Sequence, residues 1–351
     1  MLHVIANEVA PFDRGRATGE ALADRLARVW ASYASLFVRR AGIPEPDALA
    51  FGAATLELVR GWRPAVAEEM EGVAVGGGLE PNAVAALNAR TELLAGAVVE
   101  CSTVGRVRGP EGPWLSQNWD WFLDVPERCV IVTGPSHVTF TEAGILAKIG
   151  VNGAGLALCV DILRHPSDTR RPTATPIHLL LHQVLATCET IEDVAGLLEE
   201  ADPVASSCFT VVTSAGHGAS FEVTADGVAR VDPDDDGLLH HTNHFLDPRL
   251  ASEECLGGAL AKRCNRDAAL TRDRPATVSQ GRAALSDHDA RPDPVCRHAE
   301  PGVRGLPETG TAAYVAMDLV TRTMEAGAGP TCAAVTETLR SPVCALVTEG
   351  D

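Results

Sequence analysis

Apolar residues in the first hundred positions recur at helical spacing. In the stretch GEALADRLARVWASYASLFVRR they return every three or four residues, at Leu22, Leu26, Val29, Trp30, Tyr33, Leu36 and Phe37. The same periodicity continues around residues 45–73 and 81–96, and the glycine-rich VAVGGGLEP separates these two segments. The pattern predicts that residues 14–100 are helical.

The period changes after residue 98. Residues 209–245 alternate β-rich runs with turn signals, and Asp226-Gly227 is a favoured hairpin turn. This pattern predicts a meander of antiparallel strands.

Helical patterns interrupt the β-rich part. They cover residues 176–188, residues 190–201, where Thr190 is the expected N-cap, and a stretch near 249–271. Residues 272–312 are rich in Pro, Gly, Arg and Asp, which predicts long surface loops. Helices followed by antiparallel strands with helices between them predict a layered α+β fold.

Composition and net charge limit the classes of partner that the protein is expected to bind. The 351 residues are 46% apolar and 22% charged, as in a globular protein with one large domain or two medium ones. A net charge of −18 argues against nucleic acid and against an anionic membrane surface as partners.

The chain shows no targeting signal. The segment MLHVIANEVAPFDRGRATGEALADRL lacks the basic and apolar regions of a signal peptide, and no apolar run approaches the roughly 20 residues of a membrane span. Ten cysteines occur without a C-x-x-C pair, which favours reduced thiols and a cytoplasmic location.

One cysteine has an unusual setting. In VVECSTVGRVRGPEGPWLSQNWDWF, GPEG reads as a four-residue turn, and the hairpin it predicts places Cys101 opposite Asp120. Three of the five tryptophans would then wall a water-excluding pocket, namely Trp114, Trp119 and Trp121. The alternative is an inert buried cysteine beside a solvated aspartate.

The sequence predicts neither a metal nor a cofactor. In HHTNH the histidines His240 and His244 have i, i+4 spacing, with His241 between them, but no glutamate and no further ligand are suggested. Phosphate loops and dinucleotide fingerprints are also missing from the sequence.

Several motifs in order resemble a known family. The segments CST…SQNWDW, GGGLEPNAVAALNARTEL, HTNHF, CRHAEPGVRG (as C-R-x-x-E-x-x-x-R-G) and YVAMDL resemble the isopenicillin-N acyltransferase-like family of N-terminal nucleophile hydrolases, over nearly the whole chain. The resemblance implies a four-layer αββα sandwich. It also implies a precursor that cuts itself between Glu100 and Cys101. Residues 1–100 and 101–351 would then remain one folded unit, a heterodimer of the cleaved fragments.

The resemblance also assigns site residues. Cys101 is the nucleophile, and its released α-amine, with a reference pKa near 8, acts as the general base. Asp120 holds the amine and thiol, Asn243 is an oxyanion donor, and Arg304 supports the site. Without the resemblance, Asn243 reads equally well as a strand-end cap, and Arg304 as a solvated loop residue.

The residue before the nucleophile departs from the family pattern. The family usually has glycine there, whereas this chain has Glu100, which is bulkier and adds a negative charge. This predicts slower self-cleavage or a different geometry. Arg90 and Glu92, at i, i+2, do not share a helix face, and contact with the second fragment is the expected role.

The expected function is hydrolysis of a small-molecule amide through a thioester on Cys101, because nothing in the sequence signals a coenzyme A site. Acyl transfer to an amine is the alternative within the family. The alternative from another class is an unprocessed binding protein that keeps the fold, with Glu100 as its signature. The Ala- and Arg-rich composition fits a high-GC genome, which associates weakly with secondary metabolism. The acyl group, the amine and any higher oligomer stay open.

Overall fold

The structure is a computed structural model, and it describes residues 1–94, 101–251, 260–290, 293–299 and 306–342. Two β-sheets lie at its centre. The first has eight strands in the order β1-β4-β5-β6-β7-β8-β9-β10. These are β1 (Leu2–Ile5), β4 (Cys129–Thr133), β5 (His137–Glu142), β6 (Ile149–Asn152), β7 (Leu156–Ile162), β8 (Ser207–Thr213), β9 (Gly218–Thr224) and β10 (Gly227–Val231).

The second sheet has six strands in the order β11-β2-β3-β12-β13-β14. They are β11 (Leu238–His241), β2 (Ser102–Arg106), β3 (Trp114–Phe122), β12 (Thr309–Asp318), β13 (Thr323–Ala328) and β14 (Thr336–Arg340). Strands β2 and β3 of this sheet contact β7 and β8 of the first, so the two sheets stack face to face.

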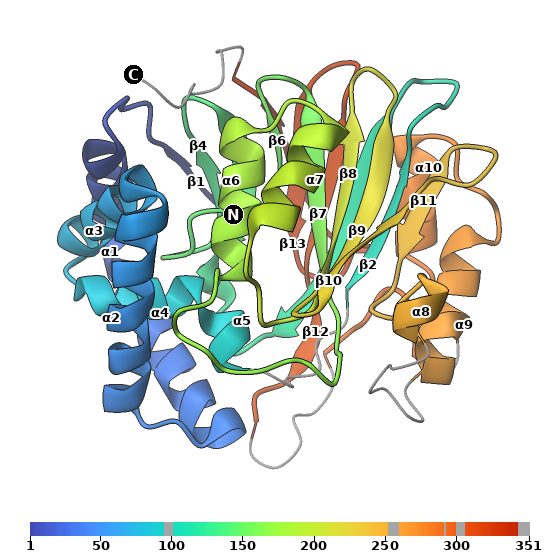
Figure 1. The fold of residues 1–351 in the computed structure, drawn as a ribbon. Coiled ribbons are helices and arrows are strands. Elements are labelled where there is room, and N and C mark those ends of the chain that lie inside the picture. The colour runs from blue at the N-terminus through green and yellow to red at the C-terminus, as the bar shows by residue number, and fades with distance from the viewer. Residues whose placement is uncertain (95–100, 252–259, 291–292, 300–305, 343–351) are drawn as a thin grey trace.

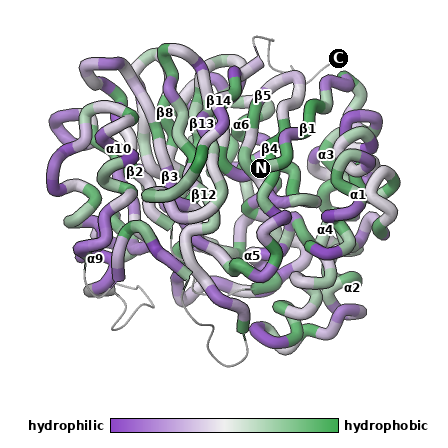
Figure 2. The backbone as a smooth tube through the Cα atoms, turned by 180° about the vertical axis from the view of Figure 1, so that it is seen from behind, coloured by the Kyte–Doolittle hydropathy of each residue, from purple (hydrophilic) through white to green (hydrophobic). Residues whose placement is uncertain are grey.

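Helices cover both outer faces of the stack (Figure 1). Helices α6 (Ile177–Thr187) and α7 (Ile191–Glu200) pack on the eight-stranded sheet, and α9 (Leu260–Thr271) and α10 (Val278–Leu285) pack on the six-stranded sheet. Figure 2 shows α9 as a mostly hydrophilic segment at the outside of the molecule. The predicted four-layer αββα sandwich is therefore confirmed.

The helices predicted before residue 100 are present and lie at one end of the sandwich (Figure 1). They are α1 (Pro11–Leu36), followed by a π-helical turn at Phe37–Ala41, α2 (Glu45–Trp62), α3 (Pro64–Gly77), α4 (Pro81–Asn88) and α5 (Arg90–Leu93). The sequence reading missed β1, which pairs in parallel with β4. The division into two fragments at residue 100 stays a prediction.

Glycines let α1 and α3 approach closely. A Cβ at Gly15 would lie 2.0 Å from the carbonyl oxygen of Glu69, and one at Gly72 would lie 2.1 Å from that of Phe12. Only residues without a Cβ permit this backbone contact.

Two of the predicted helices appear with the expected bounds, α6 and α7, and Thr190 forms a capping box with Asp193 at the start of α7. The predicted hairpin also forms, with Thr224 paired to Gly227 across the turn. The meander ends at β10, because β11 joins the other sheet beside β2. Residues 272–312 are not all loop, since α10 and the start of β12 lie within them. Short α8 (Pro248–Ala251) and a 3-10 helical turn at Pro126–Arg128 complete the described helices, none of which is long and apolar enough to cross a bilayer.

Candidate active site

The β2–β3 hairpin brings Cys101 to the inner face of the six-stranded sheet. The predicted turn forms, with the amide of Gly112 bonded to the carbonyl of Gly109. The two strands nevertheless pair one residue away from the predicted register, with Ser102 opposite Asn118 and Arg106 opposite Trp114. Continuing this register by one residue places Cys101 opposite Trp119, and not opposite Asp120 as predicted.

A one-residue change of register moves side chains to the other face of a sheet. Trp119 and Trp121 lie in the core shared with Cys101, and their rings stack with centroids 5.8 Å apart. Trp114 lies on the opposite face, where it packs against Gly281 of α10 and donates to the carbonyl of Ala276. Its predicted place in the pocket beside Cys101 is therefore wrong.

The backbone nitrogen of Cys101 has a defined acceptor. It donates a hydrogen bond of 2.6 Å to Oδ1 of Asn243, which lies just after β11. Cys101 itself is 2% exposed. Two residues separated by 142 positions are thus joined at the atom that self-cleavage would convert into an amine.

Asn243 is held from several sides. Its φ is 64°, in the left-handed region that asparagine tolerates better than most residues. Its Nδ2 donates to the carbonyl of Ile162 at 2.9 Å. Two buried arginines of α9 complete the arrangement, because Arg263 donates to the Asn243 carbonyl and Arg266 to its Oδ1. Donors on both sides of Oδ1 fix the orientation of the amide.

Asp120 lies next to the nucleophile in a different way from the one predicted. A hydrogen bond from its backbone reaches the Cys101 thiol and favours the thiolate. Its buried carboxylate accepts a bond of 2.7 Å from Thr311 on β12 and lies 3.8 Å from the guanidinium of Arg297. Its role in holding the amine stays a prediction.

A second carboxylate, which the sequence patterns did not predict, lies near Cys101. Burial raises the pKa of Asp161, on β7, to about 6. Its Oδ2 accepts a hydrogen bond of 2.5 Å from Thr103 and lies 4.0 Å from Nδ1 of His241. Burial, and next the charges of Asp161 and Asp120, raise the pKa of the Cys101 thiol well above its usual range in the intact chain.

Charged residues also line the tryptophan side. Lys148 lies 2.7 Å from Glu142 and 3.7 Å from the centre of the Trp119 ring. Burial lowers the pKa of Lys148 to about 7, although the charge of Glu142 opposes the shift. Arg90 also forms an ion pair with Glu142, at 2.9 Å. The centre of its guanidinium lies 3.9 Å from the centre of the Trp121 ring.

The expected contacts of Arg90 and Glu92 with the part of the chain after residue 100 are present. Arg90 binds Glu142, and Oε1 of Glu92 accepts the backbone N–H of Ile177 at the start of α6. Burial raises the pKa of Glu92 to about 7.

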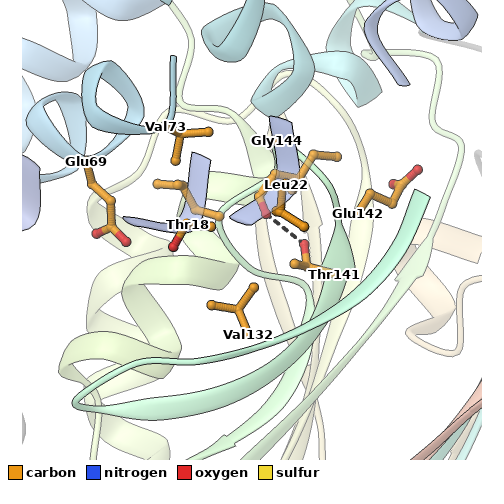
Figure 3. A pocket seen from close by; sticks show the side chains of 10 residues that line it. Thr18, Leu22, Glu69, Val73, Val132, Thr141, Glu142 and Gly144 are labelled. Carbon is orange, nitrogen blue, oxygen red and sulfur yellow. Dashed lines mark hydrogen bonds between the residues drawn. The ribbon is translucent and has the colours of Figure 1, made fainter. Parts of the chain in front are cut away.

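A small pocket lies between α1, α3 and the first sheet, and Glu142 is one of the residues that line it (Figure 3). Thr18, Leu22, Glu69, Val73 and Val132 are among its lining residues. Its volume of about 20 Å³ holds roughly one water molecule. It is therefore too small to be a substrate site.

The remaining predicted residues have separate outcomes. Glu100 and Arg304 lie outside the described residues, so their roles stay predictions. His240 bonds Asp267, His241 bonds Glu222 and His244 contacts Thr242, so the histidines of HHTNH each have a different partner.

Several residues of this site carried no signal in the sequence. Asp161, Lys148, Arg263 and Arg266 belong to no motif, and only the tertiary structure brings them to Cys101 and Asn243. Their burial is what distinguishes these charged residues from surface ones. A charged position in the sequence does not reveal whether its side chain is buried.

Comparisons with known proteins agree with the motifs. A sequence model of the family described as acyl-coenzyme A:6-aminopenicillanic acid acyl-transferase matches residues 107–326. The chain is 32% identical over 191 residues to the acyl-coenzyme A:6-aminopenicillanic-acid-acyltransferase 40 kDa form of Emericella nidulans. This match covers 52% of each chain, so it spans about half the length of that relative.

The solved structures that match are more distant in sequence. Penicillin V acylase from Agrobacterium tumefaciens has a TM-score of 0.42 and 13% identity, covering 70% of this chain and 88% of that one. A mutant of the conjugated bile acid hydrolase from Clostridium perfringens has a TM-score of 0.40 and 13% identity, covering 72% of this chain and 100% of that one. The family match extends over more than half of the chain and confirms the resemblance seen in its motifs: this protein belongs to the acyl-coenzyme A:6-aminopenicillanic acid acyl-transferase family.

Proposed function

We propose that the chain cuts itself between Glu100 and Cys101 and then uses the Cys101 thiol to cleave a small-molecule amide. The observation that carries this proposal is the 2.6 Å hydrogen bond from the Cys101 nitrogen to Oδ1 of Asn243. Cleavage would turn this nitrogen into an α-amine that already has an acceptor in place. Family membership supports acyl transfer as the class of chemistry.

The amine would act as the base for its own thiol. A neutral amine that donates one N–H to Asn243 keeps its lone pair free for the thiol proton. The sulfur then attacks the amide carbonyl, and the tetrahedral intermediate collapses to a thioester. The leaving amine takes up the proton. Water next attacks the thioester, releasing the acid and returning the proton to Cys101.

The substrate class follows from the family. The family and the Emericella relative are named for acyl transfer to 6-aminopenicillanic acid, so a compact amide is the expected substrate. We favour hydrolysis, because the sequence carries no recognisable coenzyme A motif, and acyl transfer to an amine is the second outcome. No diffusible cofactor is needed, since Cys101 supplies both nucleophile and base.

The two fragments would remain bound to each other. β1 is hydrogen-bonded to β4 across the cleavage point, and the ion pair of Arg90 with Glu142 is buried on both sides. One hydrophobic core contains residues from before and after residue 100. We therefore expect the small fragment to be the partner of the large one.

An acyl-enzyme trapping experiment tests the activity. The purified protein is incubated with a panel of small amides and quenched in acid, and the intact masses are measured. We expect one acyl group on the fragment that begins at Cys101, and free acid as the product. Added hydroxylamine should divert the acyl group to a hydroxamate. Undiminished turnover in Cys101→Ala would contradict the mechanism, whereas product formed only with an amine acceptor would identify a transferase.

A further inference from the structure

Four potential metal ligands lie close together outside the candidate active site. They are His288, after α10, Cys296 and His298, in the loop before β12, and Cys332, in the turn between β13 and β14. One ligand atom from each lies within 4.8 Å of the corresponding atom of every other. Among the described residues, this is the one group of three or more such side chains whose atoms meet in this way.

The spacing of these atoms matches tetrahedral coordination. Nε2 of His288 lies 3.2 Å from Nε2 of His298, which lies 3.4 Å from Sγ of Cys332. A tetrahedron with Zn–N near 2.05 Å and Zn–S near 2.3 Å has edges of roughly 3.3 Å between nitrogens and roughly 3.5 Å between nitrogen and sulfur. Both distances therefore fit a single ion between the side chains.

The ligand-bearing segments are held together by one buried side chain. Nδ2 of Asn118, on β3, donates to the carbonyls of Leu285 and Val295 at 2.8 and 3.0 Å. Its Oδ1 accepts the hydroxyl of Thr331. Val295 and Thr331 directly precede Cys296 and Cys332, and Leu285 ends the helix that leads to His288.

A further backbone bond joins two of the ligand segments, because the amide of Cys296 donates to the carbonyl of Asp287, the neighbour of His288. These hydrogen bonds hold the ligand backbones close together, as a preorganised site requires.

We propose that His288, Cys296, His298 and Cys332 bind one Zn²⁺ ion. Two thiolates and two imidazoles are the ligand set of structural zinc sites, and four protein ligands leave no open position for a substrate or a reactive water. The sequence pattern does not predict this site, because its ligands are spread from residue 288 to residue 332 without the short spacing of a zinc finger.

The ion would brace the carboxylate beside the nucleophile. Arg297 lies between two of the ligands, and its backbone exchanges two hydrogen bonds with Thr311, at 3.0 and 2.9 Å. Thr311 in turn donates to Asp120. Fixing Cys296 and His298 therefore fixes the backbone against which Asp120 rests. The proposal stands independently of the chemistry at Cys101.

Metal analysis of the untagged protein, purified without added zinc or chelator, tests the site. We expect about one zinc per chain, and a fall to background in His288→Ala and in Cys332→Ser. Both side chains are exposed, so their loss leaves no cavity in the core. Matched controls are His217→Ala and Cys264→Ser, which change an exposed histidine and an exposed cysteine elsewhere and should keep the zinc.

Cobalt gives an independent readout of the geometry. Zinc-free protein titrated with Co²⁺ should develop the intense visible bands of tetrahedral thiolate coordination at one equivalent, and Cys332→Ser should lose them. Zinc absent from the wild type, zinc retained in both site variants, or a pale octahedral cobalt spectrum would overturn the proposal. A mass lower by two hydrogens, from a disulfide between Cys296 and Cys332, would also overturn it.

Discussion

The backbone nitrogen of Cys101 lies 2.6 Å from Oδ1 of Asn243, so the side chain after β11 binds the first atom of the proposed catalytic fragment. Nδ2 of the same amide is bonded to the carbonyl of Ile162. In the intact chain, Asn243 therefore holds the nucleophile's backbone through its oxygen. The family resemblance assigns it a second role, through its nitrogen, as an oxyanion donor.

Two substitutions separate these roles. Asn243→Ala removes both and should lower turnover by about 10²-fold or more, the typical cost of a lost oxyanion donor. Asn243→Asp keeps an oxygen for the Cys101 amine but has no N–H. If the oxyanion role dominates, Asn243→Asp should be as inactive as Asn243→Ala. If amine positioning dominates, Asn243→Asp should recover much of the wild-type rate in steady-state assays of the cleaved enzyme.

The matched control is Asn152→Ala. Asn152 is also a buried amide, bonded to the backbone of Cys188 and Leu156, and it has no contact with Cys101. It should lose stability but keep its turnover per folded molecule. Near wild-type turnover in Asn243→Ala would show that Asn243 is only structural.

Asp161 should set the pH profile of the reaction. Its pKa of about 6 means that it is mostly charged at pH 7 and above, and a negative charge there opposes deprotonation of the thiol. Asp161→Asn removes this charge. The rising limb of kcat/KM, which belongs to the coupled amine and thiol, should consequently move to lower pH.

An exposed carboxylate provides the comparison for this experiment. Asp235→Asn changes the net charge by the same amount but lies on a surface turn, so its pH profile should match the wild type. An Asp161→Asn profile that is unchanged, or moved to higher pH, would show that the charge of Asp161 does not act on Cys101.

The glycine contact between α1 and α3 predicts a stability difference. Gly72→Ala would force a Cβ against the Phe12 carbonyl and should lower the free energy of unfolding by about 1–3 kcal/mol. Gly61→Ala, in α2, meets nothing within 4 Å and should raise it by roughly 0.5–1 kcal/mol. Urea denaturation in the Cys101→Ala background, which we expect to stay one chain, measures both. Equal effects of the two substitutions would refute the packing argument.

Alkylation should locate the nucleophile. Iodoacetamide is expected to abolish turnover of the cleaved enzyme in step with modification of the peptide that begins at Cys101, and substrate should slow both. Peptide mass spectrometry follows the modification. Full loss of activity with Cys101 still unmodified would point to another reactive thiol.

Periodicity and motif order predicted the layers of the fold, but the sheet register needed the structure. The turn at Gly109–Gly112 is correct, yet one extra residue before it places Trp119 opposite Cys101. Trp114, five residues from Trp119 on the same strand, faces the other side of the sheet. Side chains alternate along a strand, so a single residue decides which tryptophans meet the nucleophile. Strand β1 was missed because four residues carry too little pattern.

The charged groups of the site escaped prediction for a different reason. Asp161, Lys148 and Arg266 come from β7, the segment before β6, and α9, and only the stacking of the two sheets with the outer helix brings them to Cys101 and Asn243. The proposed zinc ligands are similarly gathered by Asn118 from three separate segments. Sequence spacing reports local structure, and these contacts are long-range.

Self-cleavage before Cys101 can be read directly from the intact mass of the purified, active protein. We predict two chains, the larger beginning Cys-Ser-Thr at Cys101, and a single uncut chain for Cys101→Ala. Cys101→Ser should cleave more slowly, since its hydroxyl is the weaker nucleophile. Glu100→Gly, which restores the usual family residue, should accelerate the cut in a time course after synthesis. A single full-length chain in fully active wild-type enzyme would show that activity does not depend on self-cleavage before Cys101.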